Sequence, residues 1–366
     1  MSSEPARLRI AALGQPRVVA LRAHEGMSSL SRWHARVLWR DVGIDLGAMV
    51  GEVAALELAD MDGSTRALER IIDRVGYVGP ARDGWHAYEL ELVDFVWPLT
   101  LGSGYCIHQE RTAQQVVAET LRAAGVDTAR VVWRLGARYA QRVQCVQYGE
   151  SDWAFVERVL ADDGIAYWFE DGDRGQLLVL GDGVGAHEPI GGVRGPFADG
   201  AGTRAAQAAV HELRRVDRMT PEAVFVRDHD LRHPELPVDG AAGHGDLEHF
   251  ELPSGLLVAE AAAARAAVRL QQLQRDAVRA VARTSCIRFE PGRLAQVDGV
   301  PDDLLEGEWL VAEVEHAVQP ADRDAEATAY GAQVVLVPSS LDGRARPFRP
   351  AAPSGARAFT ASRRPR

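Results

Sequence analysis

The sequence contains no lysine, so all 41 basic side chains of the Lys and Arg class are arginines. The 52 acidic side chains outnumber them, and the formal net charge at pH 7 is −11. Excess negative charge repels the phosphate backbone, which argues against general nucleic-acid binding. Arginine pairs with carboxylates through a planar fork, so this composition suits ion pairs at interfaces.

Cysteine is also scarce, with Cys106, Cys145 and Cys286 as its only occurrences and no CxxC spacing. An odd and sparse set of this kind argues against a disulfide framework and against a zinc ribbon. We expect three isolated thiols.

The sequence lacks long apolar runs. Its first residues, MSSEPARLRIAALG, have no continuous apolar core of a signal peptide, and no run approaches the ~20 residues of a membrane span. We therefore expect a soluble protein that is made in the cytoplasm and exported by a route other than a cleaved signal.

The stretch from Gln144 to Glu170 has the pattern strand, helix, strand. Ser151 is placed to cap the helix, because its hydroxyl can accept from free backbone N–H groups in the first turn. Gly164 is placed to end the helix in a left-handed conformation. Apolar side chains between them recur at helical spacing and predict one buried face. These are Phe155, Val156, Val159 and Leu160.

The run VQYGESDWAFVERVLADDGIAYWFE, Val146 to Glu170, resembles the signature of the VgrG family, the spike proteins of type VI secretion systems. A similar pattern occurs in hub proteins of contractile phage tails. Ala161, Asp162 and Asp163 stand where family members often carry glutamates, which keeps the acidic character. The matching positions are Val146, Gln147, Tyr148, Glu150, Ser151, Asp152, Phe155, Arg158, Leu160, Gly164, Ile165, Tyr167 and Phe169.

The resemblance implies a mainly β fold with an α/β insertion: two antiparallel β-barrels of phage tail hub type plus an inserted helix-strand subdomain. We expect the first barrel over 8–100, the insert over 101–185, the second barrel over 186–338, and a Pro/Arg-rich tail over 339–366. In the family, such a tail leads toward a spike domain, which this sequence does not include.

Local patterns add detail to this division. Alternation predicts strands over 33–40, 53–58, 68–77 and 85–94 in the first part. Thr112 and Gln115 form a capping-box pattern in the insert, and DGDRG, 171–175, predicts a hairpin turn. After the insert we expect loops over 181–202 and 231–245, and strands over 210–215, 223–227, 286–289, 309–316 and 327–337. We also expect a helix over 256–283. Its apolar stripe would consist of Val258, Ala261, Ala264, Val268, Leu273 and Val278.

Several residue groups contain side chains of the types found in functional sites. His229, His233, His244 and His249 with Asp230 and Asp246 are of the types that ligate zinc, but the predicted loop gives them no fixed helical spacing, so we expect a solvated loop. The glycines of LGDGVGAHEPIGG precede no predicted helix that would hold a phosphate. Ser151 lacks a GxSxG elbow. The arginines Arg265, Arg269, Arg275 and Arg279 predict a solvated or subunit-facing surface.

We therefore expect no catalytic, cofactor-binding or metal-binding residues, and no cofactor. The resemblance implies a non-catalytic structural hub of a type VI spike, a symmetry adaptor between the hexameric tube protein (Hcp) and a trimeric spike. Two alternatives remain: the hub of a contractile phage tail or phage-like injection particle, and a carrier of a hydrolase effector.

The expected partners are two further copies of the chain, forming a homotrimer in the particle, Hcp and baseplate components, without nucleic acid or stable membrane insertion. The protein would be secreted as part of the injected spike without a signal peptide. In dilute solution we expect a weak trimer or a monomer.

Overall fold

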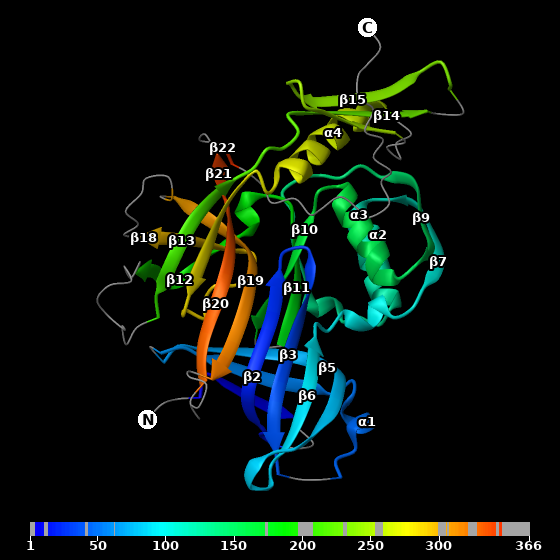
Figure 1. Ribbon diagram of the computed structural model, residues 1–366. Coiled ribbons are helices and arrows are strands. Elements are labelled where there is room, and N and C mark those ends of the chain that lie inside the picture. Colours follow the sequence, from blue (N-terminus) through cyan, green and yellow to red (C-terminus); the bar gives the residue numbers. More distant parts are fainter. Residues whose placement is uncertain are drawn as a thin grey trace.

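The computed structural model describes residues 4–10, 14–40, 43–61, 63–172, 175–196, 208–229, 233–252, 259–298, 305, 307–320, 328–341 and 344–345. The fold is mainly β, and its helices pack beside the sheets rather than forming a core of their own (Figure 1). None of the helices in these residues is both long and apolar enough to cross a membrane.

The N-terminal part is an antiparallel run of strands. Its elements are β1 (Ala6–Ile10), β2 (Arg17–Gly26), β3 (Ser29–Trp39), α1 (Leu46–Met49), β4 (Val53–Ala59), β5 (Thr65–Pro80), β6 (His86–Val93) and the 3₁₀ helices η1 (Arg82–Gly84) and η2 (Trp97–Thr100). The strand order is β1-β4-β5-β6-β3-β2. In β3 the alternate residues Trp33, Ala35, Val37 and Trp39 are buried, so the predicted alternation is confirmed.

The C-terminal part contributes a second antiparallel run, β13-β17-β20-β19. Its strands and helices are η4 (Val184–Ala186), β12 (Glu188–Pro196), β13 (Val210–Asp217), β14 (Ala223–His229), β15 (Pro237–Gly243), β16 (Glu248–Glu251), α4 (Ala259–Gln274), β17 (Val278–Thr284), β18 (Arg293–Asp298), β19 (Glu308–Pro320), β20 (Thr328–Pro338), β21 (Ser340–Leu341) and β22 (Arg344–Ala345).

The two runs are joined into one sheet. Strand β19 pairs with β2 in antiparallel register, with Val314 opposite Glu25 and His316 opposite Ala23. The result is a 12-stranded sheet, in which β18 and β12 extend from β19. Among the described residues no sheet closes on itself, so the two expected barrel regions share a continuous, open set of strands.

The insert lies beside this sheet and is built from β7 (Gly104–Arg111), α2 (Ala113–Ala123), η3 (Thr128–Arg130), β8 (Val131–Arg134), β9 (Arg142–Glu150), α3 (Asp152–Asp162), β10 (Ala166–Gly172) and β11 (Gly175–Gly181). Strands β10, β11 and β8 form one small sheet, and β7 pairs with β9 in another. Residues 173–174 of the predicted hairpin turn lie outside the described residues, but the β10–β11 pairing on either side is present.

The signature helix α3 forms as predicted. The Ser151 hydroxyl accepts from the Ala154 N–H (3.2 Å), and Gly164 has φ +69°, in the left-handed region that a side chain disfavours. The predicted apolar face is at most 1% exposed. The capping box of Thr112 and Gln115 is also confirmed, with both hydrogen bonds present. These local signals need no distant residue, which is why the sequence is sufficient to predict them.

Three predictions beyond residue 180 are wrong because distant pairing prevails over local composition. The expected loop 181–202 contains β12, whose backbone pairs with β18 in parallel, across an irregular register between Pro189 and Arg194. The expected loop 231–245 contains β15, which pairs with β14. The expected strand 286–289 has no strand pairing. Its Cys286 N–H instead donates to Thr284 Oγ1 (3.0 Å), and strand β18 begins later, at Arg293.

The expected helix 256–283 is wrong at its C-terminal end. Helix α4 ends at Gln274, and β17 then pairs with β13 and β20. Its buried face is also different from the predicted stripe, since Ala262 and Ala266 are fully buried whereas Ala264 is exposed. A Cβ at Gly240 of β15 would lie 2.1 Å from the Ala262 carbonyl carbon, so small residues on both sides permit this close approach.

Candidate functional site

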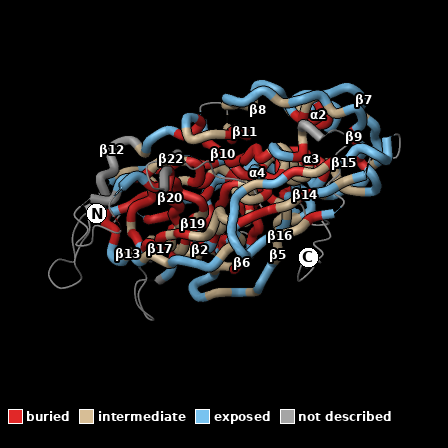
Figure 2. Tube along the Cα trace, turned by 90° about the horizontal axis from the view of Figure 1, so that it is seen from above, coloured by how far each residue is buried: buried red, intermediate tan, exposed pale blue. Residues whose placement is uncertain are grey.

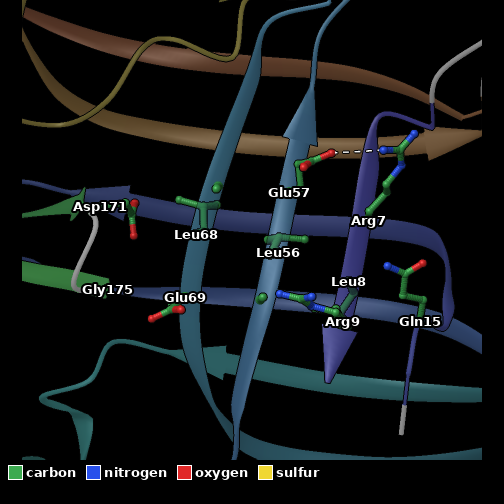
Figure 3. A pocket seen from close by; sticks show the side chains of 13 residues that line it. Arg7, Leu8, Arg9, Gln15, Leu56, Glu57, Leu68, Glu69, Asp171 and Gly175 are labelled. Carbon is green, nitrogen blue, oxygen red and sulfur yellow. Dashed lines mark hydrogen bonds and ion pairs between the residues drawn. The ribbon is translucent and has the colours of Figure 1, made fainter. Parts of the chain in front are cut away.

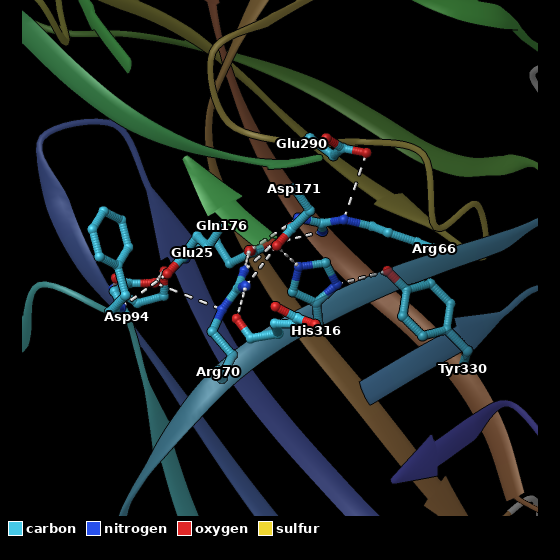
Figure 4. A network of polar contacts seen from close by, with 12 residues as sticks. Glu25, Arg66, Arg70, Asp94, Asp171, Gln176, Glu290, His316 and Tyr330 are labelled. Atoms are coloured by element: carbon cyan, nitrogen blue, oxygen red, sulfur yellow. Dashed lines mark hydrogen bonds and ion pairs between the residues drawn. The ribbon is translucent and has the colours of Figure 1, made fainter. Parts of the chain in front are cut away.

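A buried cluster of charged side chains lies where the two runs of the large sheet meet the insert (Figure 4). Two arginines of β5, Arg66 and Arg70, enter it from inward positions that alternate with the core residues Leu68 and Ile72. Arg70 is only 1% exposed. A guanidinium so deeply buried requires negative partners, because an unpaired charge in a protein interior is strongly unfavourable.

Both arginines bind the same two carboxylates. Arg66 donates to both oxygens of Glu25 in β2 (2.7 and 3.1 Å), and Arg70 donates to Glu25 Oε1 (3.0 Å). Asp171, at the end of β10 in the insert, accepts from Arg70 (2.7 Å) and from Arg66 (3.3 Å). Arg66 Nε also lies 3.5 Å from Glu290, which precedes β18. The cluster thus connects the N-terminal run, the insert and the C-terminal run.

A histidine of the C-terminal run completes the contacts of Glu25. His316 Nε2 lies 2.9 Å from Glu25 Oε2, and its Nδ1 lies 2.8 Å from the Tyr330 hydroxyl. Because an ionised carboxylate only accepts hydrogen bonds, the ring proton belongs on Nε2, and Nδ1 accepts from Tyr330. The imidazole stacks on Trp33 of β3 at 5.1 Å between ring centroids. The neutral ring therefore bridges two strands of the C-terminal run to the N-terminal run.

Burial disfavours the charged form of each ionisable group here. The partners of Glu25 outweigh this effect, whereas burial prevails for His316 and Tyr330. Although burial favours the neutral acid, Arg66 and the hydrogen bond from His316 hold the pKa of Glu25 well below its ordinary value. Burial lowers the pKa of His316, despite the opposing effect of Glu25, so the imidazole is neutral at pH 7. Tyr330 is likewise held neutral, since burial raises its pKa.

Asp94 lies at the inner edge of the cluster and is fully buried. It accepts from the Ser31 backbone N–H (2.6 Å) and hydroxyl (2.9 Å) and from Gln176 of the insert (2.5 Å), and lies 3.6 Å from Arg70 Nε. Burial outweighs these favourable contacts and raises the pKa of Asp94 to about 6. One carboxyl of the cluster, Asp94, therefore changes its protonation state at about pH 6.

A second set of ion pairs connects the insert to β12 and β18. Arg134 of β8 donates to both oxygens of Glu170 (2.8 and 3.0 Å) and lies 3.3 Å from Glu188. Arg293 pairs with Glu188 at 2.7 Å and lies 3.6 Å from Glu170. Trp168 packs directly beneath this group, and its indole N–H donates to Glu170 (2.9 Å). The insert is thus attached to the C-terminal run by paired charges above an apolar contact.

Two arginines expected on a solvated or subunit-facing surface instead face inward. Arg265 pairs with Asp162 of the insert (2.6 Å), and Arg269 pairs with Glu251 of β16 (2.7 Å). Gln272 of the same helix donates to the Ala161 carbonyl (2.7 Å). Helix α4 is therefore attached to the insert by polar residues, Arg265 and Gln272. Arg279 lies in β17 rather than in a helix.

The predicted histidine group is not brought together as one site. His229, at the end of β14, His233 and His244 are exposed, and Asp230 lies outside the described residues. His249 is directed toward Glu251, 3.8 Å away, beside Arg269. No group of three or more His, Cys, Asp or Glu side chains in the described part of the chain could hold a metal ion. The expectation of no metal site stays a prediction.

The glycine segment LGDGVGAHEPIGG contains the three-residue 3₁₀ helix η4 and then enters β12, so it leads into no α-helix whose N-terminus could hold a phosphate. Its His187 is buried, with Nδ1 2.9 Å from the Gly292 carbonyl oxygen. Ser151 serves as a helix cap, as described above.

A surface depression of about 420 Å³ lies over β1, β4 and β5, near the end of β10 (Figure 3). Its rim carries side chains of both charge signs, and Arg7 pairs with Glu57 across it (3.3 Å). The mixed lining favours no single class of ligand, and of the three strands under it only β5 contributes arginines to the charge cluster.

The two-stranded ribbon β7–β9 is mostly exposed and lies at the edge of the molecule (Figure 2). Its outer face is apolar: Tyr105 and Tyr148 are 74% and 79% exposed and pack edge to face at 5.2 Å. Ile107 and Val146 continue this face. Exposed tyrosines beside aliphatic side chains are typical of protein interfaces.

Sequence reasoning missed the charge cluster. One signal was present: Arg66 and Arg70 occupy the same face of a strand as Leu68 and Ile72, where an apolar residue would be expected. Their partners, however, lie in separate parts of the chain, with Glu25 and His316 291 residues apart. No local pattern could have joined them.

Solved structures with the same fold are found among secretion and tail proteins. The c3393 protein of E. coli, described as a type VI secretion component similar to T4 tail proteins gp27 and gp5, superposes with a TM-score of 0.70 at 20% identity, over 95% of this chain and 80% of that chain. A 43 kDa prophage tail protein from Shewanella oneidensis gives a TM-score of 0.64 at 13% identity, over 92% and 98%.

In sequence, the chain is 24% identical over 313 residues to the type VI secretion system spike protein VgrG1a of Pseudomonas aeruginosa, which covers 83% of this chain and 48% of that protein. The chain thus spans about half the length of this relative. The phage tail baseplate hub (GPD) family matches residues 24–322, a range that includes the insert, most of both strand runs, and Glu25 and His316 of the charge cluster. The chain belongs to the phage tail baseplate hub (GPD) family.

Proposed function

We propose that this chain is a non-catalytic structural hub of a type VI secretion spike, acting by shape between a hexameric tube and a trimeric spike. The observation that supports it most is the shared sheet: each chain offers two antiparallel runs, and the buried charge cluster holds them in one fixed arrangement. Three chains would present six such runs, which matches the six subunits of a tube ring.

The proposal extends to the division of the chain. Residues 8–100 and 186–338 are the two tube-facing modules, 101–185 is an insert outside the ring, and 339–366 lead toward the spike. The pairing of β2 with β19 supports a rigid connection between the two modules, since neither run ends in a free edge at that point. The protein would leave the cell as part of the injected particle, in contact with Hcp and baseplate components.

The test is oligomeric state. Light scattering across a concentration series is expected to show a monomer or weak trimer, because association must offset several kcal/mol of lost translational and rotational freedom. Adding the hexameric tube protein of the same gene cluster should shift the mass toward three chains per ring. A dimer that persists at every concentration would contradict the proposal, since a twofold assembly cannot present six equivalent modules.

The second candidate is the hub of a phage tail or phage-like particle, favoured by the fold shared with the prophage tail protein. The neighbouring genes distinguish the two. Genes for a secretion membrane complex and sheath ATPase would favour the spike, whereas genes for a capsid and tail fibres would favour the phage tail.

A further inference from the structure

Cys106, His108 and Glu119 form a hydrogen-bonded chain on the insert, away from the junction of the two runs. Cys106 and His108 are two residues apart on β7, so they face the same side of the strand, and Glu119 comes from helix α2. Cys106 Sγ lies 3.5 Å from His108 Nε2, and His108 Nδ1 lies 3.1 Å from Glu119 Oε2. This is the order of groups in which a base activates a nucleophile and a carboxylate orients the base.

The position of the imidazole proton follows from the partners. Glu119 is held ionised, because the hydrogen bond from Arg111 (3.0 Å) and the contact with His108 keep its pKa below the ordinary value. An ionised carboxylate only accepts, so the proton of the neutral ring lies on Nδ1 and is donated to Glu119. Nε2 is then a bare acceptor that is directed at the thiol of Cys106.

The ring is also held in place by packing. His108 stacks on Phe155 of α3, with ring centroids 5.8 Å apart and planes at 14°. Its side chain is only 9% exposed, whereas Cys106 is exposed. His108 is thus a fixed base that can remove the thiol proton, and the exposed Cys106 can be reached by a reagent from solvent.

The other two cysteines differ from Cys106 in their exposure to solvent. Cys145 and Cys286 are buried, and burial raises the pKa of Cys145. Buried thiols in apolar surroundings are inert, since the thiolate is the nucleophile. The chain thus contains its own internal controls.

We propose that Cys106 is a reactive thiol, activated by His108 and positioned through Glu119, that exchanges with small disulfides. In the step, His108 Nε2 takes the thiol proton, and the Cys106 sulfur attacks one sulfur of the disulfide. The new S–S bond forms as the old one breaks, and the departing thiolate takes the proton from the imidazolium. The disulfide is the oxidant, so atoms and electrons balance. The thiol lies on an open strand and not in the depression of Figure 3, which suits stoichiometric modification rather than turnover.

The test uses the full chain and oxidised glutathione at pH 7.5, with intact mass and peptide mapping to follow each cysteine separately. Cys106 is expected to react first, and His108→Gln is expected to slow it roughly five- to tenfold. Gln109→Ala is the matched control, because Gln109 is the next residue on the strand and faces the opposite side. It should leave the rate unchanged.

Glu119→Gln tests the positioning role. Its rate should fall between those of the wild type and His108→Gln, and the double variant should be no slower than His108→Gln alone, since both act through one imidazole. A structural defect would instead add to the first loss. Thermal melting confirms that each variant is folded, and if His108→Gln unfolds, the comparison of Glu119→Gln with Gln109→Ala carries the test. The proposal would be overturned if Cys106 reacted as fast in folded His108→Gln and Glu119→Gln as in the wild type, or if it reacted later than Cys145 or Cys286.

Discussion

Glu25 and His316 are 291 residues apart in sequence, yet Glu25 Oε2 and His316 Nε2 lie 2.9 Å apart in the interior. Both side chains are almost fully buried, at 4% and 2% exposure. Their contact links the N-terminal and C-terminal strand runs through a buried hydrogen bond. It also brings the histidine beside the carboxylate that neutralises Arg66 and Arg70. Four predictions test this junction and the packing around it.

Glu25→Gln should reduce the free energy of unfolding by roughly 3–5 kcal/mol, because it leaves two buried guanidinium groups with too little negative charge. Urea denaturation followed by tryptophan fluorescence measures the change. Glu57→Gln is the control, since Glu57 pairs with Arg7 at the surface, where an ion pair contributes at most about 1 kcal/mol. Equal losses in the two variants would mean that the cluster is not electrostatically important.

His316 should make stability depend on pH. Its pKa in the folded chain is below the ordinary 6.5, so the unfolded chain binds more protons between these two values, and stability is lost as the pH falls from 6.5 through the lower pKa of the folded chain. His316→Gln can retain both hydrogen bonds but cannot be protonated. The unfolding midpoint of the variant should therefore approach, or pass, that of the wild type between pH 7.5 and 5.5.

Asp94 acts in the opposite direction. Its pKa is raised to about 6 from 3.8, so the folded chain binds more protons between those values, and its contribution to stability increases on acidification. Asp94 is present in both the wild type and His316→Gln. Its effect therefore cancels when the unfolding midpoints of these two proteins are compared at the same pH. A gap between the two midpoints that stays constant with pH would contradict the assignment of a buried neutral His316.

Gly292→Ala should separate the insert from β18. Gly292 has φ +84°, and a Cβ there would lie 2.5 Å from Trp168 Cδ1. Gly84→Ala is the matched control, since Gly84 also has positive φ (+74°) but open space around it. The control should cost about 1–2 kcal/mol through the backbone alone, and Gly292→Ala about 1–3 kcal/mol more through the clash. Equal unfolding energies would show that Trp168 can move aside.

Phe155→Ala should destabilise the chain by roughly 3–5 kcal/mol, because this residue of α3 is fully buried in one apolar cluster with α2 and stacks on His108 of the ribbon. Calorimetric melting provides the measurement. Tyr105→Ala, on the exposed face of the same ribbon, should change stability by no more than about 0.5 kcal/mol. An unchanged melting temperature for Phe155→Ala would mean that the apolar face of α3 does not form the core of the insert.

The sequence predicted those elements whose causes are local. The Ser151 cap, the face of Phe155 and Val159, and the alternation of β3 are determined by residues a few positions apart. The β12 and β15 strands could not be predicted, because their glycines and prolines signal a loop, and only the pairing with β18 and β14 makes them strands. The end of α4 was missed for the same reason: Ala277 to Thr284 favours a helix by composition, but β13 and β20 hold it extended.

The candidate site also shows that local patterns can be predicted from the sequence whereas distant contacts cannot. The predicted histidine loop used residues close in sequence, and the fold leaves most of them apart at the surface. The charge cluster draws its residues from both ends of the chain, so only the three-dimensional structure could assemble it.

The pairing of β2 with β19 has a consequence for how the chain is made. Strand β2 leaves the ribosome early, but its partner on the side away from β3 is β19, so this edge of the N-terminal run stays open until residues 308–320 have been synthesised. Long-range pairing of this kind slows folding, and an open strand edge invites aggregation in the meantime. During that interval Glu25 also lacks its contact with His316. The N-terminal run expressed alone should therefore accumulate in inclusion bodies, so the two halves of the hub cannot be studied as separate fragments.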